Sequence, residues 1–198
     1  MLHSKLIRLG ILMVATASLL ASGVSAVDRD KAWEIASLLN VCRGDTVAVV
    51  GPAPTEFLRA MSRRVGREGR VTVIETDKET VEALGREIEL AGLLNVTPVL
   101  GSAAHPELPR GVRSIVLYDA YRHLDEKDAF FDAVKSALAP DGEIAVIDWY
   151  RRPMKTGPPL AERIASHQMM KQVGRFGFRP VGRHNILPER YFIVFETK

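Results

Sequence analysis

Short runs of consecutive apolar residues alternate along the chain with segments whose apolar residues recur every three or four positions. The short apolar run at 46–50, bounded by turn residues, is typical of a strand buried on both faces of a sheet. Together with four further segments rich in apolar residues it predicts five strands, at 46–50, 70–74, 96–100, 114–118 and 143–147. The spaced segments between them predict helices, because one apolar face recurs at the period of a helix.

Polar residues mark where the predicted helices begin and end. Thr55 and Asp77 stand directly before amphipathic segments, and we expect both to be helix N-caps. Gly92 is expected to end the helix that Asp77 begins. A helix is predicted over 126–139, followed by a turn at Pro140-Asp-Gly142 and the fifth strand. A last helix is predicted around 160–173.

The C-terminal part departs from this alternation. Two strand-like segments, 179–187 and 191–196, follow each other without a helix between them, which predicts an antiparallel hairpin. Strands that alternate with helices imply right-handed crossovers and parallel pairing. The predicted fold class is therefore α/β: a doubly wound, mostly parallel seven-stranded sheet with an antiparallel C-terminal hairpin.

Residues 1–26 have the composition of a secretory signal. Lys5 and Arg8 precede an apolar run from Leu9 to Ala21, and small residues at 24–26 suit cleavage after Ala26. The sequence thus predicts an exported protein, periplasmic or secreted, with a single domain at 27–198 and no later membrane span. An uncleaved signal that anchors the chain in the membrane is the alternative, although the apolar run is shorter than the ~20 residues of a spanning helix.

Charge and cysteine content narrow the function classes. Removal of Lys5 and Arg8 with the signal lowers the formal net charge from +3 to +1, so nucleic acid is not an expected partner. Cys42 is the single cysteine, which excludes an internal disulfide, and we expect it to be buried near the end of a helix rather than reactive. His105, His167 and His184 lack metal-ligand spacing, and no metal is predicted.

In an open sheet of this kind, ligands bind beyond the carboxyl ends of the strands. Four segments are expected there: the turn that begins at Gly51, the acid Glu75, the pair Gly101-Ser102, and the segment 119–123. Glu75 directly follows the second strand, where an acid can accept hydrogen bonds from both ribose hydroxyls of a nucleoside. His123 has a ring that can serve as a base near neutral pH.

Each candidate also has a structural interpretation. Glu75 can be a solvated acid, and Ser102 a turn residue. Asp119 can cap its loop or pair with Arg122, and His123 can be a hydrogen-bonded structural residue. The basic segment 151–155 is a solvated loop in the simplest interpretation and contacts an anionic substrate in the other.

The order of these segments resembles that of the class I S-adenosylmethionine-dependent methyltransferases over nearly all of residues 27–198. The pieces that carry the resemblance are VGREGRVTVIE at 65–75, LNVTPVLG at 94–101, LAPDGEI at 138–144, IDWYRRP and GPP within 147–159, and the final YFIVFE at 191–196. The resemblance implies S-adenosylmethionine as cofactor and a reversed seventh strand. It places the cofactor beside Gly51, Ala53, Thr55, Glu75 and Ser102.

The first loop differs from the pattern of that family. An acid and three glycines are usual there, and the corresponding residues are Val49, Gly51, Ala53 and Thr55, so the acid and two glycines are missing. Ser102 stands where an acid near the adenine is common. Glu75, at the ribose position, keeps the chemistry that the resemblance implies.

Three functions remain open at this point. A working methyltransferase would hold its acceptor, which the sequence does not identify, near Asp119, Tyr121 and His123, with Arg151 or Arg152 orienting an acidic group. A non-catalytic binding or scaffolding module would reuse the same cleft for another ligand or a protein. A redox or metal-related role has the least support in the residues.

Overall fold

The computed structural model describes residues 29–102 and 105–198. The predicted signal at 1–26 and its cleavage site lie outside the described residues. None of the helices in the described ranges has the length and apolar character needed to cross a bilayer.

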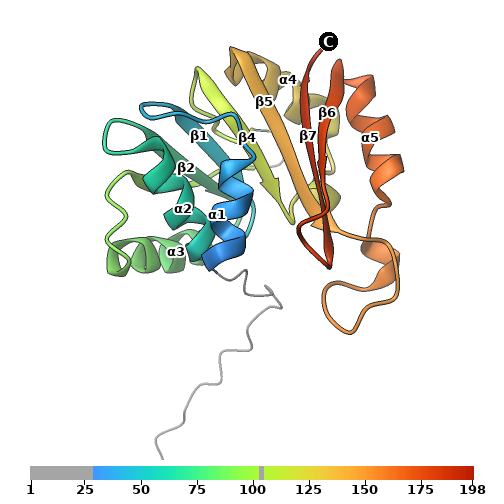
Figure 1. The fold of residues 1–198 in the computed structure, drawn as a ribbon, viewed down its shortest axis with the longest axis horizontal. Helices are drawn as coiled ribbons and strands as arrows, with labels where there is room; N and C mark the ends of the chain where they lie inside the picture. Colours follow the sequence, from blue (N-terminus) through green and yellow to red (C-terminus); the bar gives the residue numbers. More distant parts are fainter. Residues whose placement is uncertain (1–28, 103–104) are drawn as a thin grey trace, which may run out of the picture.

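One seven-stranded sheet organises the described residues, with the strand order β3-β2-β1-β4-β5-β7-β6 (Figure 1). The strands are β1 (Thr46–Val50), β2 (Arg70–Glu75), β3 (Val96–Leu100), β4 (Val112–Tyr118), β5 (Leu138–Trp149), β6 (Phe178–His184) and β7 (Arg190–Thr197). Strands β1 to β5 pair in parallel, whereas β7 pairs antiparallel with both β5 and β6. The predicted fold class is confirmed, including the C-terminal hairpin.

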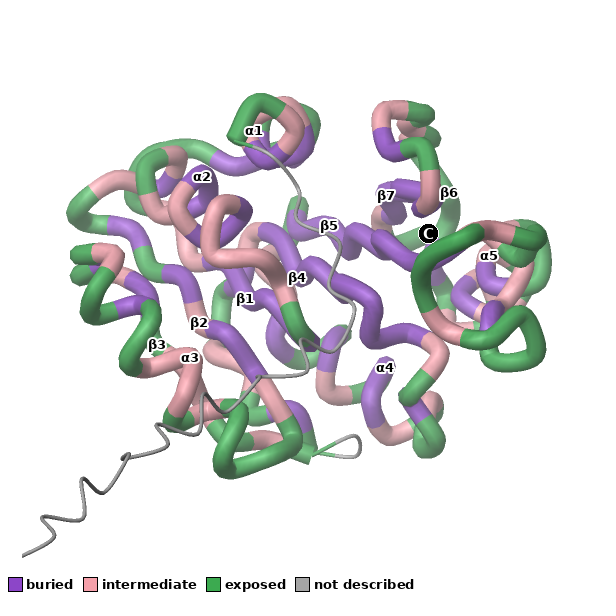
Figure 2. The backbone as a smooth tube through the Cα atoms, turned by 90° about the horizontal axis from the view of Figure 1, so that it is seen from below, coloured by how far each residue is buried: buried purple, intermediate pink, exposed green. Residues whose placement is uncertain are grey.

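Helices cover both faces of the sheet. The helices are α1 (Arg29–Ser37), α2 (Thr55–Val65), α3 (Lys78–Leu90), α4 (Lys127–Ala137) and α5 (Ser166–Arg175), with short 3-10 helices η1 (Tyr121–His123) and η2 (Leu160–Glu162). Side chains of α1, α2 and α3 form one apolar core with one face of the sheet, and side chains of α4 and α5 form a second core with the other face. Figure 2 shows the buried strands β1, β4 and β5 between these layers.

The predicted central strands are confirmed because burial on both faces requires the uninterrupted apolar runs seen in the sequence. Four of the five residues of β1 are buried, and β4 has a buried residue at six of its seven positions. Strand order reverses around β1, since β2 leads outward on one side and β4 on the other. This reversal places the carboxyl end of β1 at the switch point where open α/β sheets bind ligands.

The turn predicted at Pro140-Asp-Gly142 is wrong. These residues belong to β5, which runs from Leu138 to Trp149 without a break. Val112 pairs with Leu138 and Ser114 with Glu143, so β5 carries extra residues in a bulge between these two pairs. Pro and Gly occur at bulges as well as in turns, so both structures suit these residues.

The last predicted helix, around 160–173, is divided. Residues Leu160–Glu162 form η2, and α5 begins only at Ser166. Arg163 between them has an extended backbone and a buried side chain. Its guanidinium bonds to backbone carbonyls of the preceding loop, and this set of bonds replaces a continuous helix.

Two further local predictions are wrong. Thr55 is the first residue of α2 rather than its N-cap, because Pro54 occupies the cap position and its carbonyl accepts hydrogen bonds from the Phe57 and Leu58 N–H groups. Cys42 is exposed. It lies beyond α1, in the turn before β1, where its backbone N–H donates to a carboxylate oxygen of Asp45. Asp77, by contrast, is confirmed as the N-cap of α3, since its carboxylate accepts from the Thr80 N–H at 2.7 Å.

Candidate functional site

A cavity of about 150 Å³ lies at the carboxyl ends of β1, β2 and β4. It is where the topology predicts a ligand site, at the reversal of strand order. Its wall combines residues of all four predicted site segments with apolar side chains: Val50, Gly51, Ile74, Glu75, Thr76, Ser102, Ala120, His123, Leu124 and Phe130. The sequence analysis did not identify Ile74, Leu124 and Phe130, because their apolar character is the same as that of core residues.

Gly51 brings two loops close together. Its φ is +96°, a conformation that favours glycine, and its N–H donates to the Ile74 carbonyl at 3.0 Å. A Cβ atom at this position would lie 2.5 Å from the carbonyl oxygen of Tyr118 and 2.8 Å from Cβ of Ala120. Glycine is therefore required where the turn after β1 passes the end of β4.

The other two residues of that turn predicted to contact a ligand, Ala53 and Thr55, do not face the cavity. Ala53 donates its N–H to the Gly51 carbonyl at 2.8 Å, and its side chain packs against the core on the α1–α2 side. The Thr55 hydroxyl donates to Glu87 of α3 at 2.9 Å. Neither residue is among those that line the cavity. Pro52 and Pro54 have no N–H to offer a ligand. Of the three predicted contacts in this loop, Gly51 is the one that reaches the cavity.

Glu75 ends β2 and lies half-buried in the cavity wall. Burial, together with the smaller effect of the nearby negative charge of Asp77, raises the pKa of its carboxyl group from 4.5 to about 7. The carboxyl group forms no hydrogen bond with another residue of the described ranges. It is thus a partly desolvated acceptor with both oxygens available to a ligand.

Ser102 has both of the roles considered for it. Its N–H donates to the His105 carbonyl and its hydroxyl accepts from the His105 N–H, each at 2.9 Å, so it forms a turn. It also lines the cavity on the side of β3. The hydroxyl is engaged in the turn both as an acceptor and as the donor of a long hydrogen bond of 3.5 Å to the His105 carbonyl, so donation to a ligand would replace that long bond.

Asp119, directly after β4, forms a buried ion pair. Its two carboxylate oxygens accept from Nε and Nη2 of Arg190 at 2.9 and 2.8 Å. An ion pair was one of the structural interpretations, but the predicted partner, Arg122, is wrong, since Arg122 pairs with Asp148 at 2.8 Å. Asp119 has a φ of +51°, which Asp tolerates better than most residues. Its carboxylate is fully used in holding the loop to the first residue of β7.

The guanidinium of Arg190 is itself enclosed by aromatic rings. It lies 3.8 Å from the ring centroid of Trp149 and 5.8 Å from that of Tyr118. Burial would lower its pKa, whereas the hydrogen bonds and charge of Asp119 raise the pKa, with a net increase. The loop after β4 is therefore fixed by a charged pair whose charges are shielded from water.

Tyr121 and His123, on the short helix η1, point to different surroundings. Tyr121 is buried and its hydroxyl donates to Oε1 of Gln172 on α5 at 2.9 Å. Burial raises the pKa of this hydroxyl well above its usual value, so it does not ionise near neutral pH. His123 is exposed and lines the cavity. Of the three residues predicted to act on an acceptor, His123 is the one that faces the candidate cofactor site.

No group of three or more His, Cys, Asp or Glu side chains within 29–102 and 105–198 is arranged to hold a metal ion. The side chains available at the cavity are one carboxyl group (Glu75), one imidazole ring (His123), the hydroxyl groups of Thr76 and Ser102, and an apolar wall.

No protein-family model matches the chain, and no curated protein sequence matches it. Solved structures do match its fold. A SAM-dependent methyltransferase from Aquifex aeolicus superposes with a TM-score of 0.74 at 21% identity, covering 87% of this chain and all of that one. Fibrillarin from Aeropyrum pernix, crystallised with natively bound S-adenosyl-L-methionine, gives 0.62 at 19% identity, covering 83% of this chain and 72% of that one.

The same fold also carries other chemistry. The [4+2]-cyclase SpnF superposes with a TM-score of 0.69 at 13% identity, covering 85% of this chain and 80% of that one. At these identities the likeness concerns the fold and not the reaction. The strand order, the reversed β7 and these superpositions together show that this chain has the fold of the class I S-adenosylmethionine-dependent methyltransferases.

Proposed function

We propose that this protein is a methyltransferase-like protein that binds S-adenosylmethionine through its adenosine part in the cavity beside Glu75. The observation that carries the proposal is the half-buried carboxyl group of Glu75, which has no hydrogen-bond partner among the described residues and stands at the reversal of strand order. A carboxylate at the end of β2 in such a sheet can accept from both ribose hydroxyls.

The wall of the cavity suits the adenosine half of the cofactor. Ile74, Leu124 and Phe130 provide an apolar surface of the kind that a flat purine ring fills. Gly51 contributes only backbone to the cavity wall, because it has no side chain. The Ser102 hydroxyl lies at the cavity and could donate to a ligand in place of its long hydrogen bond to the His105 carbonyl.

The methionine half has fewer partners. Val49 stands where an acid is usual in proteins of this fold, and the missing hydrogen bond to a charged group costs ~1.5–3 kcal/mol, or roughly 10- to 150-fold in affinity. Ala53 stands where a glycine is usual, and its side chain limits close approach of a ligand to the backbone. We therefore expect weaker binding than in proteins with the complete loop.

When bound, the cofactor would supply an electrophilic methyl group, and this chain would have to hold an acceptor in line with it. His123 is the residue placed to take a proton from that acceptor, since its ring is exposed at the cavity wall. Asp119 and Tyr121 would act as positioning residues, because each fixes the loop after β4 through its own hydrogen bonds.

A second candidate is a non-catalytic module that uses the cavity only to bind. Two hydrogen-bonded contacts favour this candidate. Asp119 binds Arg190 and Tyr121 binds Gln172, so neither side chain is available to react with an acceptor. Export, which residues 1–26 predict, favours it as well, because a secreted protein must obtain its cofactor outside the cytosol. Cell fractionation of the tagged chain tests the export proposal: a cytosolic, full-length product would contradict it.

Calorimetric titration of the purified protein with S-adenosylmethionine and S-adenosylhomocysteine tests the binding proposal. We expect micromolar to millimolar binding that Glu75→Gln weakens at least tenfold, whereas the exposed helix residue Glu79→Gln leaves it unchanged. Absence of binding at millimolar ligand, or equal binding by both variants, would overturn the proposal.

A gain-of-binding variant tests the loop alignment, and a methyl-transfer assay separates the two candidates. Val49→Asp with Ala53→Gly and Thr55→Gly restores the usual loop composition and should tighten binding. If the unmodified chain already transfers a labelled methyl group and His123→Gln abolishes transfer without weakening binding, the catalytic candidate holds. Binding that persists without any transfer supports the non-catalytic one.

A further inference from the structure

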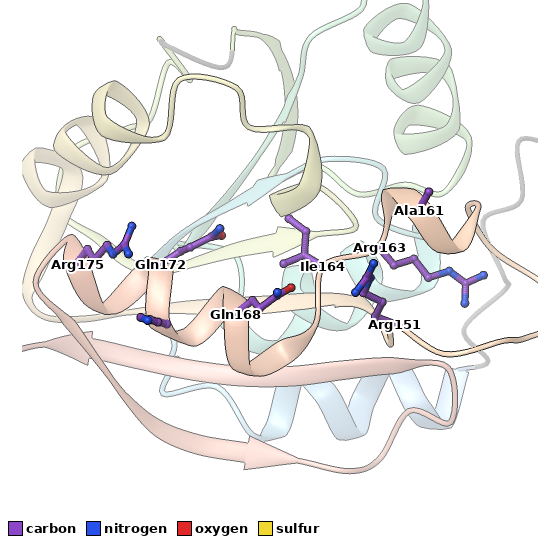
Figure 3. A pocket seen from close by; sticks show the side chains of 8 residues that line it. Arg151, Ala161, Arg163, Ile164, Gln168, Gln172 and Arg175 are labelled. Carbon is purple, nitrogen blue, oxygen red and sulfur yellow. The ribbon is translucent and has the colours of Figure 1, made fainter.

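A second and larger hollow, of about 480 Å³, lies between α5, η2 and the loop that follows β5 (Figure 3). We call it the α5 groove. It is lined by Arg151, Ala161, Arg163, Ile164, Gln168, Lys171, Gln172 and Arg175. Four of these eight residues are cationic at neutral pH and none is acidic. A groove of this composition attracts anions, because no lining group offsets the positive charge.

The charges are spread along one side of α5. Gln168, Lys171 and Arg175 are three and four residues apart, so they share one face of the helix. Seven residues of helix span about 10 Å. Arg151 lies beside the N-terminal half of α5 and Arg175 at its C-terminal end, as Figure 3 shows. The groove therefore presents donors to more than one anionic group of an elongated ligand.

The exposed cations of the groove have no carboxylate partner. The side chains of Arg151, Lys171 and Arg175 form no hydrogen bond or ion pair with the residues that the structure describes. Some exposed cations elsewhere on the described surface, such as Lys135 and Arg179, pair with nearby acids, whereas others, such as Arg67 and Arg86, are also unpaired. What distinguishes the groove is that three unpaired cations line one hollow, as a site for an external anion would require.

Arg163 adds a buried positive charge. The side chain is buried, and its guanidinium donates to the carbonyl oxygens of Pro158, Arg152 and Thr156 at 2.8 to 3.0 Å. No carboxylate lies within ion-pair distance of it among the described residues. Since carbonyl dipoles satisfy its hydrogen bonds but leave its net charge, this guanidinium strengthens the positive potential of the groove while fixing the loop that carries Arg151.

One hydrogen bond connects the groove to the helix that borders the cofactor cavity. Gln172 in the groove accepts from the Tyr121 hydroxyl on η1, and His123, two residues further along η1, lines the cavity. Arg151, which lines the groove, follows the carboxyl end of β5, and the cavity lies at the carboxyl ends of β1, β2 and β4. A ligand held by Arg151 would therefore lie at the same end of the parallel strands as the cavity.

We propose that the α5 groove binds the anionic part of the methyl acceptor, a small molecule with carboxylate or phosphate groups, through Arg151, Lys171 and Arg175. This inference rests on the proposed function, of which it names the substrate class. It also distinguishes the two arginines that the sequence analysis named for this role. Arg151 lines the groove, whereas Arg152 donates to the Pro188 carbonyl and stacks on Tyr150.

Citrate and pyrophosphate serve as probes for this site, the first for carboxylates and the second for phosphates. Calorimetry on the full protein should show binding of at least one of them, weakened at least tenfold by Arg151→Gln with Lys171→Gln and Arg175→Gln. The control variant, Arg67→Gln with Arg70→Gln and Arg86→Gln, removes three positive charges from exposed residues outside the groove. It should bind the probe as the unmodified protein does.

The probe that binds better identifies the anionic group. Equal binding by the groove and control variants, or no binding of either probe at millimolar concentration, would overturn the inference. If the triple variant does not fold by circular dichroism, Arg151→Gln and Arg175→Gln are measured singly, and a threefold loss in each is expected. Titration with S-adenosylhomocysteine on the same samples separates the two proposals: probe binding without nucleoside binding overturns the proposed function and leaves the groove standing as an anion site.

Discussion

Asp119 and Arg190 form a two-bond ion pair that joins residues 71 positions apart in the sequence, with N···O distances of 2.9 and 2.8 Å. Asp119 follows β4 and Arg190 begins β7, so the pair ties the loop at the candidate site to the antiparallel hairpin. Both side chains are almost fully excluded from solvent.

Removal of the Asp119 charge should destabilise the protein strongly. Asp119→Asn keeps a residue that tolerates the positive φ but leaves the Arg190 guanidinium buried without its counter-charge, for which we expect a loss of about 3–5 kcal/mol in the free energy of unfolding. Urea denaturation measures it. The exposed Asp125→Asn in the same loop should change stability by less than about 0.5 kcal/mol. A loss below about 1 kcal/mol for Asp119→Asn would show that the pair contributes little.

Gly51→Ala tests the close approach of the turn after β1 to the loop after β4. The new Cβ would meet the Tyr118 carbonyl oxygen at 2.5 Å in a left-handed backbone conformation, and we expect a loss of about 2–4 kcal/mol. Gly92→Ala is the matched control, since Gly92 also has a positive φ (67°) but nothing within 4 Å of a new Cβ. It should lose only the backbone strain of about 1–2 kcal/mol. Equal losses in the two variants would contradict the contact.

Glu75 should make stability depend on pH between its ordinary pKa of 4.5 and its raised pKa of about 7. In this range the folded protein keeps the proton that the unfolded chain has released, so the free energy of unfolding falls as pH rises. Glu75→Gln removes this contribution. Its stability relative to the unmodified protein should therefore increase from pH 5 to pH 8, as measured by urea denaturation at both values. An unchanged difference would mean that Glu75 titrates normally.

The carboxyl group of Glu75 also determines how ligand binding should depend on pH. Ribose hydroxyls donate to a carboxylate more strongly than to a carboxylic acid, because an ionised acceptor forms stronger hydrogen bonds. Nucleoside affinity should rise between pH 6 and pH 8, and Glu75→Gln should flatten the profile. Calorimetry over this range measures the effect, and a fall in affinity with rising pH would contradict the role of Glu75.

Cys42 should react in the folded state. Because its side chain is exposed, we expect a thiol reagent such as DTNB to modify one thiol per chain without denaturant, at a rate similar to that of a free thiol. Cys42→Ser should give no reaction. Modification that requires denaturant would restore the sequence-based expectation of a buried residue.

The sheet could be predicted from the sequence because its strands are local features. The strands predicted at 46–50 and 96–100 are confirmed residue for residue. The first is buried on both faces, which leaves an apolar run in the sequence, whereas the second is an edge strand in which Val96 alone is buried. The bulge at 140–142 could not be predicted, because Pro-Asp-Gly also suits a turn and the choice depends on pairing with β4. The break at Arg163 depends likewise on carbonyl groups of the folded loop.

The candidate site could be predicted as a set of segments but not as a set of contacts. Topology alone places Gly51, Glu75 and Ser102 at the carboxyl ends of the parallel strands, and all three line the cavity. The withdrawal of Asp119 and Tyr121 could not be foreseen, since their partners, Arg190 and Gln172, come from elements more than 50 residues later. The exposure of Cys42 depends on where α1 ends, and neighbouring residues do not fix such boundaries well.

The position of Arg190 at the start of the final strand has a consequence for how the protein matures. A ribosome releases β1 to β5 before it releases β7, so the loop that carries His123 lacks its ion pair until Arg190 has been synthesised. Chains that stop before Arg190 would contain all five parallel strands and still lack the residue that fixes that loop. Assembly of the pocket is thereby coupled to synthesis of β7, and shorter products would not form it.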